Sequence, residues 1–242
     1  MQCCFCESEV ESLIDLCKFP LEPYPLLNIN EIYRQNVSFM FCHSCSHGFL
    51  SQFPPARVLD NFYKKTYESY TTVSDMGNIQ DKNHLTALDF ILNQLEMMDA
   101  DLDIVEVGGY DGHVLQFLES NSNKVGSSTL IEPNHRGASL GKISGLKVIN
   151  EFLSDELCSQ SDLKFDLVVN RHVIEHLENP RDFLIQLTML LKDTNSKLII
   201  ETPSLDHMLN KVWIRPIQLQ HLHYFSLNSL RVILPNECQI LE

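Results

Sequence analysis

The chain has 242 residues, of which 44% are hydrophobic, and a formal net charge of -14 at pH 7. This size supports one domain with a sizeable core plus a smaller annex. The acidity argues against nucleic acids and anionic membranes as partners, because both bind basic surfaces. No apolar run reaches the ~18–20 residues that span a bilayer, and the first residues lack the basic and apolar parts of a signal peptide. We therefore expect a cytoplasmic protein.

The cysteines are concentrated near the N-terminus, where six of the eight precede residue 46. In a reducing compartment such clustering indicates metal or redox chemistry more often than disulfides. Cys3-x-x-Cys6 and Cys42-x-x-Cys45 each present two thiolates, and together they predict one four-sulfur zinc site. A redox pair and fortuitous cysteines are the alternatives. Spare or substitute ligands are Cys4, Cys17, His43 and His47.

The first 60 residues show little hydrophobic periodicity and contain five prolines. Such a segment could hardly build its own core, so a bound metal would supply folding free energy that burial cannot. An aromatic run at 62–72 and a polar stretch follow, and we place the join between two domains at 72–80. The predicted division is a zinc-binding domain with an aromatic linker at 1–75 and a second domain at 76–242.

Helical and strand patterns alternate from residue 83 onward. Apolar residues that fall on one helical face are Leu85, Leu88, Ile91, Leu92 and Leu95. Strands are predicted near 103–107, 128–132, 146–150, 165–170 and 196–202, and helices near 83–98, 112–120, 180–192 and 226–234. This alternation predicts an α/β fold with a Rossmann-like, doubly wound parallel sheet that binds ligands at the carboxyl ends of its strands.

The first of these strands ends in a glycine-rich turn, Glu106-x-Gly108-x-x-x-Gly112, which also contains Gly109 and Tyr110. Glycines let a ligand approach the backbone closely, and the helix that follows offers unpaired N–H groups. A dinucleotide site needs G-x-G-x-x-G, and an acid at the strand end would repel a pyrophosphate, so a nucleoside without one fits better. An ordinary strand-to-helix connection is the alternative.

The second strand closes on Glu132 and Pro133, about 20–26 residues after the first acid. At that place a carboxylate can accept both ribose hydroxyls of a nucleoside. The second acid therefore favours a nucleoside site over an ordinary turn.

The fourth strand ends at Asn170 and leads into His172-x-x-Glu175-His176. This spacing is that of the inverted zinc-protease motif, which requires a mid-helix position. Here the segment leaves a buried strand and meets Pro180, which suits the first position of a helix. We therefore reject a metalloprotease, and a structural role is the alternative for His176.

The glycine turn and Glu132 resemble the first motifs of the class I S-adenosylmethionine-dependent methyltransferases. That family carries His-x-x-Glu-His-x-x-x-Pro after its fourth strand, between cofactor and substrate. The resemblance implies S-adenosylmethionine as cofactor and adds Asn170 and His172 to the residues that bind it.

The cysteine pairs, the aromatic run ending at Tyr70 and the late segment His221-x-x-Tyr-Phe-Ser resemble the sugar C-methyltransferases that act on nucleotide-linked keto-deoxysugars. This resemblance implies an N-terminal zinc domain and a small-molecule acceptor, a sugar nucleotide. It implies that His221 is the base, with substrate-side roles for His176 and for Tyr70 or Tyr67. The base would remove a proton next to a carbonyl, and the enolate would then attack the methyl group.

The chain departs from this family at several places. Gln218 and Gln220 stand where the family has a tyrosine and a glutamate, and glutamine cannot take a proton, so the base role falls to His221 alone. A third domain and two last strands are also missing, which predicts a short sheet or a truncated chain. These departures favour a non-catalytic zinc- and cofactor-binding protein as the alternative function. A zinc-bearing RNA methyltransferase is opposed by the acidity.

Overall fold

The computed structural model describes residues 1–21, 32–69, 82–210 and 217–240, apart from the side chains of 65–69, 82 and 83. Tyr70, the side chain of Tyr67 and the predicted join at 72–80 lie outside the described residues. The chain divides into two compact units. The parallel-sheet unit comprises 70–171 and 185–201, and the antiparallel-sheet unit comprises 1–69, 172–184 and 202–242.

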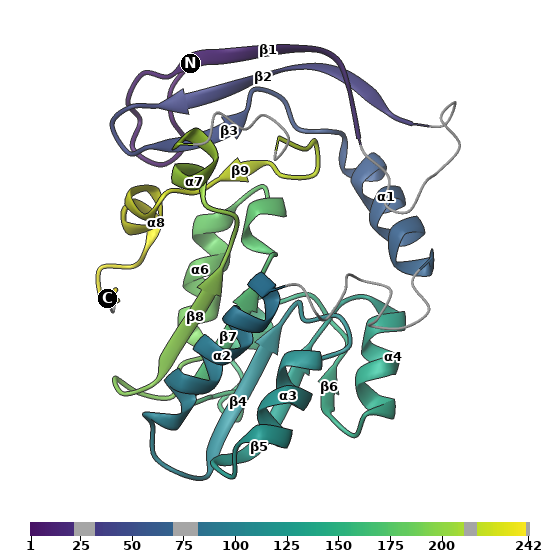
Figure 1. Ribbon diagram of the computed structural model, residues 1–242, viewed down its shortest axis with the longest axis vertical. Helices are drawn as coiled ribbons and strands as arrows, with labels where there is room; N and C mark the ends of the chain where they lie inside the picture. The colour runs from purple at the N-terminus through teal and green to yellow at the C-terminus, as the bar shows by residue number, and fades with distance from the viewer. Residues whose placement is uncertain (22–31, 70–81, 211–216, 241–242) are drawn as a thin grey trace. The chain divides into compact units, whose positions relative to one another are not determined.

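The parallel-sheet unit is built on five strands in the order β6-β5-β4-β7-β8, and every neighbouring pair is parallel (Figure 1). The strands are β4 (Leu102–Val107), β5 (Val125–Ile131), β6 (Lys147–Ile149), β7 (Leu167–Arg171) and β8 (Lys197–Glu201). Each strand overlaps one of the five strands that were predicted from β-branched and apolar residues. The predicted Rossmann-like α/β sheet is confirmed.

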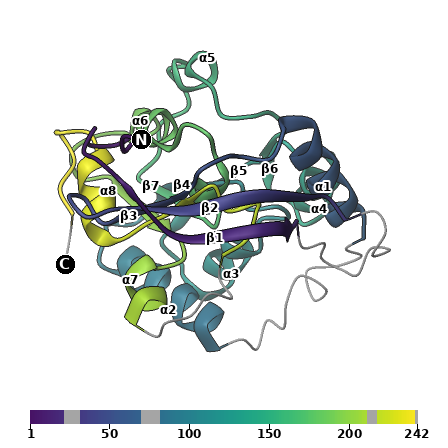
Figure 2. The ribbon, with the colours of Figure 1, turned by 90° about the horizontal axis from the view of Figure 1, so that it is seen from above.

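Helices lie on both sides of this sheet: Figure 2 shows α2 and α3 on one side and α5 and α6 on the other. Their bounds are α2 (Lys82–Glu96), α3 (His113–Asn121), α4 (His135–Ile143), α5 (Asp155–Cys158) and α6 (Pro180–Met189). Leu88, Ile91 and Leu95 of α2 pack in the core with apolar residues of α3 and the central strands. Leu85, which we expected on the same face, is 42% exposed. Helix α6 begins at Pro180, as predicted.

The antiparallel-sheet unit contains four strands in the order β1-β2-β3-β9. Three come from the N-terminal segment, β1 (Glu11–Pro20), β2 (Arg34–Cys42) and β3 (His47–Leu50), and the fourth, β9 (His223–Tyr224), comes from near residue 223. The helices of this unit are α1 (Ala56–Ser69), η3 (Ile174–His176), α7 (Leu205–Asn210) and α8 (Leu227–Ile233). The late segment of the chain thus extends the antiparallel sheet, and among the described residues it adds no strand to the parallel one.

The N-terminal segment does have a core, contrary to our expectation from its weak periodicity. Val37, Phe39 and Leu50 of β2 and β3 are buried together with Leu222 and Tyr224 from the late segment. The residues from the late segment are distant in sequence from those of β2 and β3, so a local pattern could not reveal this core. Burial contributes to the folding of this unit, at roughly 25 cal/mol per Å² of apolar surface, so its stability would not depend on a metal alone.

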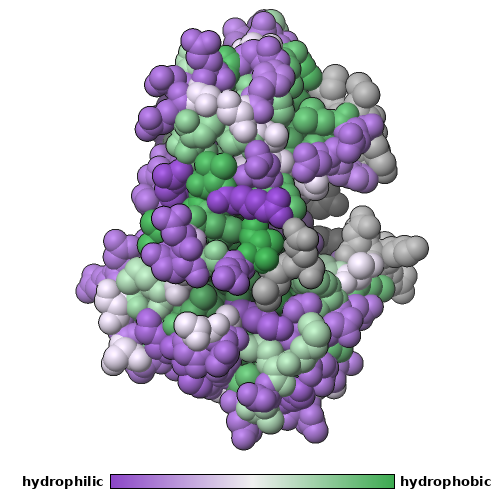
Figure 3. All heavy atoms as spheres, turned by 90° about the vertical axis from the view of Figure 1, so that its left-hand side faces the viewer, coloured by the Kyte–Doolittle hydropathy of each residue, from purple (hydrophilic) through white to green (hydrophobic). Residues whose placement is uncertain are grey.

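The outer surface agrees with the acidic, polar composition of the chain. Figure 3 shows hydrophilic residues over much of the face that it presents, with hydrophobic ones between them. Among the described residues, no helix combines the length and the apolar character needed to cross a membrane.

Candidate functional site

The glycine-rich turn lies at the carboxyl end of β4 and bends through left-handed backbone conformations. Gly108 and Gly112 have φ values of 76° and 71°, and Tyr110 has a φ of 55°, which is uncommon for a residue with a side chain. Gly109 is required for space: a Cβ there would lie 2.2 Å from Cδ of Glu106. The turn therefore passes directly over the Glu106 carboxyl group.

Three buried polar side chains around this turn have oxygen atoms without a hydrogen-bond partner in the described part of the chain. They are Glu106 (Oε2), Asp111 (Oδ1) and Asn170 (Oδ1). Burial raises the pKa of Glu106 to about 7. Unpartnered buried polar atoms are costly and rare in folded proteins, so they indicate a place for a bound ligand. Glu106 and Asn170 were predicted as site residues, whereas Asp111 was not.

Glu132 follows β5 and holds the turn through its carboxylate. It accepts hydrogen bonds from the backbone N–H groups of Tyr110, at 2.8 Å, and Asn134, at 2.7 Å, with Pro133 between the acid and Asn134. Burial raises its pKa to about 7, although these two hydrogen bonds act in the opposite direction. Each carboxylate oxygen has a second lone pair. Glu132 can thus support the turn and still accept a hydroxyl of a ligand.

Asn170 and His172 were predicted together but have different surroundings. Asn170 is fully buried in β7, and its Nδ2 donates to the Val107 carbonyl at 2.9 Å, which ties β7 to β4. His172 belongs to the antiparallel-sheet unit, has a φ of 52° and has Nδ1 3.4 Å from Oε1 of Glu175. Asn170 thus lies beside the strand that leads into the glycine turn, and His172 lies beside Glu175.

A polar network that the sequence did not reveal runs from the turn across the parallel-sheet unit. His113 has Nδ1 3.6 Å from Oδ1 of Asp111 and Nε2 3.2 Å from Nε2 of His84. Nη2 of Arg171 lies 3.4 Å from Nδ1 of His84, and the guanidinium group is paired with Glu201. These residues come from four separate segments, so only Asp111 and His113, in and beside the glycine motif, could have been found from sequence.

A second group of ionisable residues lies in the antiparallel-sheet unit. One ligand-type atom from each of Glu175, His176 and His221 lies within 4.8 Å of the others. His176 donates from Nδ1 to the Gln220 carbonyl at 2.8 Å, and its ring centroid is 4.8 Å from that of His221. The Thr202 hydroxyl donates to Oε2 of Glu175 at 3.0 Å. The two predicted catalytic histidines are thus neighbours, and Glu175 joins them.

Burial sets the charges of this group. It lowers the pKa of His221 to about 4, with a further lowering from His176, so His221 is neutral at pH 7. Burial would raise the pKa of Glu175, but hydrogen bonding to His172 and the charge of His176 outweigh it and lower this pKa. An ionised Glu175 is therefore available to stabilise a positive charge on a histidine.

The four cysteines of the predicted zinc site come together. Sγ of Cys3 lies 3.6 Å from Sγ of Cys45, Sγ of Cys6 lies 3.4 Å from Sγ of Cys42, and all four sulfurs are within 4.8 Å of one another. In a tetrahedral site with Zn–S distances near 2.3 Å, the sulfurs would be about 3.8 Å apart. The end of β2 and the turn before β3 supply one pair, and the residues preceding β1 supply the other. The donor set and its spacing fit zinc.

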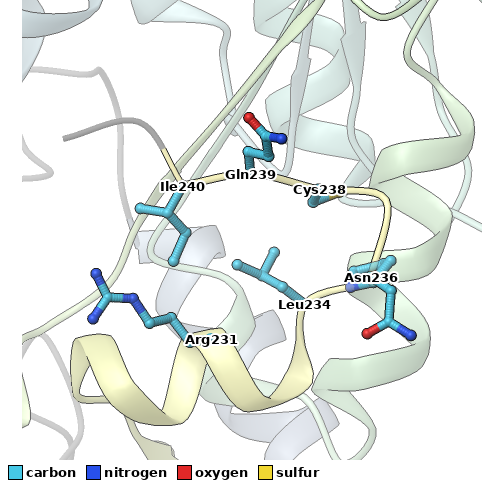
Figure 4. A pocket seen from close by; sticks show the side chains of 7 residues that line it. Arg231, Leu234, Asn236, Cys238, Gln239 and Ile240 are labelled. Carbon is cyan, nitrogen blue, oxygen red and sulfur yellow. The ribbon is translucent and has the colours of Figure 1, made fainter.

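Two hollows lie apart from these groups. One, of about 480 Å³, is formed by Arg231 of α8 and residues between 234 and 240, and Figure 4 shows their side chains around it. It contains no predicted site residue. The other, of about 200 Å³, borders Cys4 and His223 in the antiparallel-sheet unit.

A family profile described as a methyltransferase domain matches residues 79–236, which is more than half of the chain. The chain belongs to this methyltransferase family. The enzyme class predicted from the glycine turn is thereby confirmed. No curated protein matches the sequence.

Solved methyltransferase structures share the fold of this family member. A chain in the complex between the Haloferax volcanii Trm112 methyltransferase activator and a methyltransferase has 14% identity and a TM-score of 0.50, and the match covers 64% of this chain and 67% of that one. YcgJ from Bacillus subtilis has 14% identity, a TM-score of 0.48 and coverage of 62% and 66%. The plantazolicin methyltransferase BpumL, bound to S-adenosylhomocysteine and a monoazolic desmethylPZN analogue, has 18% identity, a TM-score of 0.47 and coverage of 62% and 60%. The matches thus span about two thirds or less of these structures, and such identities indicate the fold alone.

Proposed function

We propose that this protein binds S-adenosylmethionine on its parallel-sheet unit and transfers the methyl group to a small molecule, a nucleotide-linked sugar. The observation that carries the proposal is the set of buried oxygens of Glu106, Asp111 and Asn170 that have no hydrogen bond within the described part of the chain, around a glycine turn, in a chain of the methyltransferase family. A ligand with several hydrogen-bond donors at this place would remove their desolvation cost.

The residues of the parallel-sheet unit would divide the binding of the cofactor. Glu132 accepts the ribose hydroxyls, and Gly108 and Gly112 adopt the left-handed backbone conformations that form the turn. The acids at the ends of β4 and β5 disfavour a pyrophosphate, which distinguishes this site from one for a dinucleotide. S-adenosylmethionine, when bound, supplies an electrophilic methyl group on a sulfonium.

The histidine group would act on the methyl acceptor. His221, neutral at pH 7, takes the proton from a carbon next to a carbonyl, and the resulting enolate carbon is the nucleophile. The negative charge of Glu175 stabilises the protonated imidazole, and His176, held by the Gln220 carbonyl, orients the acceptor. Tyr70, which lies outside the described residues, has the substrate-side role that the family resemblance implies.

The four cysteines would hold one structural zinc ion. A site with four protein sulfurs has no open position, so its role is architectural rather than catalytic. The ion would join the residues before β1 to the end of β2, and so fix the sheet that contains β9, which begins two residues after His221.

A non-catalytic cofactor- and zinc-binding protein is the second candidate function. The low pKa of His221 favours it, because a base with a pKa of about 4 removes a proton from carbon only slowly. Gln218 and Gln220, which cannot take a proton, offer no replacement.

Calorimetry and a transfer assay test the proposal. We expect S-adenosylmethionine to bind with micromolar affinity, about -8 kcal/mol, and NAD not to bind tightly. With labelled cofactor and a nucleotide-linked keto-sugar, His221→Ala should lower transfer by roughly 10²–10⁴-fold while cofactor affinity changes only a few-fold. His207→Ala is the matched control, since His207 is exposed on α7 of the same unit.

Three other outcomes separate the candidates. Cofactor binding without transfer to any sugar nucleotide would favour the non-catalytic protein. Normal transfer by His221→Ala across pH 6–9 would eliminate proton abstraction by this histidine. Tight binding of NAD in place of S-adenosylmethionine would overturn the cofactor assignment.

A further inference from the structure

Cys4, His47 and His223 form a second group of metal-ligand type, which we call the Cys4 triad. One ligand-type atom from each residue lies within 4.8 Å of the others. His47 begins β3 and His223 begins β9, and the antiparallel pairing of these strands places them on neighbouring strands. Cys4 lies between two cysteines of the four-sulfur group but is not part of that group. None of the three has a role in the proposed methyl transfer.

The two histidines are spaced as ligands of one ion. Nε2 of His47 lies 3.1 Å from Nδ1 of His223, and two nitrogens on a tetrahedral zinc with Zn–N near 2.0–2.1 Å would be about 3.3–3.4 Å apart. The rings are nearly parallel, and Phe5 stacks on His47 with ring centroids 3.8 Å apart. Both histidines are at most 2% exposed, so their nitrogens are held in place by packing.

The contact that Nδ1 of His47 makes supports a role for Nε2 of the same ring as a metal ligand. Its Nδ1 lies 3.8 Å from Sγ of Cys3, which can accept a weak hydrogen bond. An N–H group on Nδ1 leaves the lone pair on Nε2, facing His223. Histidines that bind metal usually donate from their other ring nitrogen in this way.

Cys4 and His223 of the triad border a cavity. Nε2 of His223 is buried and lacks a well-formed hydrogen bond among the described residues, although the backbone of Glu178 lies close enough to interact with the ring. It adjoins the hollow of about 200 Å³, whose walls include Cys4, Phe53 and Glu178. With Nδ1 of His223 facing the ion, Nε2 carries the N–H group and can donate it to the Glu178 backbone or to water in the hollow.

We propose that the Cys4 triad binds a second divalent ion of the zinc class, separate from the ion of the four-sulfur group. One thiolate and two imidazoles are ligands that such ions prefer, and three protein ligands leave a fourth position open towards the hollow. The inference does not depend on methyl transfer. The difference in metal content between two variants tests it, whether or not the four-sulfur group holds an ion.

The experiment compares the full-length chain with two single-cysteine variants. Cys4→Ser removes one ligand, and because Cys4 is exposed, the core is not disturbed. Cys17→Ser is the matched control, an exposed cysteine on β1 outside both groups. Each protein is purified without chelator, equilibrated with buffered Zn²⁺ and assayed for zinc per chain, with circular dichroism as the test of folding.

We expect about two equivalents of zinc in the wild-type chain and in Cys17→Ser, and one equivalent fewer in folded Cys4→Ser. Co²⁺ loading should give the same difference, together with the loss of part of the visible absorption in Cys4→Ser. Equal metal contents in folded Cys4→Ser and wild type would overturn the proposal, and the histidines would then be a hydrogen-bonded pair only. The Cys42→Ser variant, which removes a ligand of the four-sulfur group, shows separately what the loss of zinc from that group looks like.

Discussion

Glu106 and Glu132 give the parallel-sheet unit a charge state that depends on pH near neutrality. Burial raises the pKa of each to about 7 from an ordinary value of 4.5. An acid whose pKa is higher in the folded than in the unfolded state stabilises the fold fully below its unfolded pKa, and this stabilisation is lost as the pH rises through the folded pKa. Without cofactor, this unit should therefore become less stable between about pH 4.5 and 7.

Glu106→Gln tests this dependence, because glutamine has a similar shape and never ionises. We expect the variant to gain stability relative to wild type as the pH rises from 5 to 8. At 1.36 kcal/mol for each pH unit between the two pKa values, the gain approaches about 3 kcal/mol. Denaturant unfolding of the cofactor-free protein at several pH values measures it.

Glu119→Gln is the control for Glu106→Gln, since Glu119 is exposed on α3. A constant difference between Glu106→Gln and wild type across this pH range would mean that Glu106 is already ionised at pH 5. The carboxylate would then have a partner that the structure does not show.

The site residues that could be predicted from sequence are those that lie within one short motif. Glu106, the glycines and Glu132 could be proposed as cofactor-binding residues because the strand, the turn and the acid are adjacent in the chain or regularly spaced. Asp111 is in the same motif, but its unpartnered oxygen is a property of the folded surroundings. The low pKa of His221 could not be predicted either, because burial by distant residues causes it.

At the scale of elements, the turn between β4 and α3 depends on the absence of a side chain at Gly109. Gly109→Ala should cost about 1–3 kcal/mol of stability, because the new Cβ must displace the buried Glu106 carboxyl group. We also expect weaker cofactor binding. Chemical denaturation and calorimetry measure the two effects.

A double-mutant cycle distinguishes this contact from general strain. Combined with Glu106→Ala, which removes the group that Cβ would strike, Gly109→Ala should cost much less than it does alone. If the costs of the two substitutions simply add, the clash with Glu106 is not the reason for glycine at this position.

The strands of the parallel sheet were predicted well and those of the antiparallel sheet were not. Central strands such as β4 and β7 are short runs of buried apolar residues that end at acid, glycine or asparagine. By contrast, β1 is largely exposed or half-buried, and β9 has two residues that pair with β3 across most of the chain. Such long-range pairing leaves no periodic signal in the sequence.

At the scale of the whole molecule, the chain passes between the two compact units several times. The antiparallel-sheet unit takes residues 172–184 directly after β7 and residues from 202 directly after β8. His176 and His221 are therefore in the same compact unit as the four cysteines, although the predicted division at residue 75 separates them in sequence. Local unfolding around the cysteines should consequently also disturb the structure around the two histidines.

This arrangement gives a prediction for Cys42→Ser that a simple two-domain chain would not give. Zinc content should fall by about one equivalent, because a four-sulfur site loses a ligand. The variant should also lose protection against hydrogen exchange in β1–β3, in β9 and around His221, since these belong to one unit. Methyl transfer should then be lost, while affinity for S-adenosylmethionine stays within a few-fold because the parallel sheet remains folded.

Cys17→Ser should leave zinc content, exchange and transfer unchanged. If Cys42→Ser loses its zinc but keeps the protection of β9 and its activity, the histidine group folds independently of the metal, and packing of Leu222 and Tyr224 in the core is sufficient to hold it.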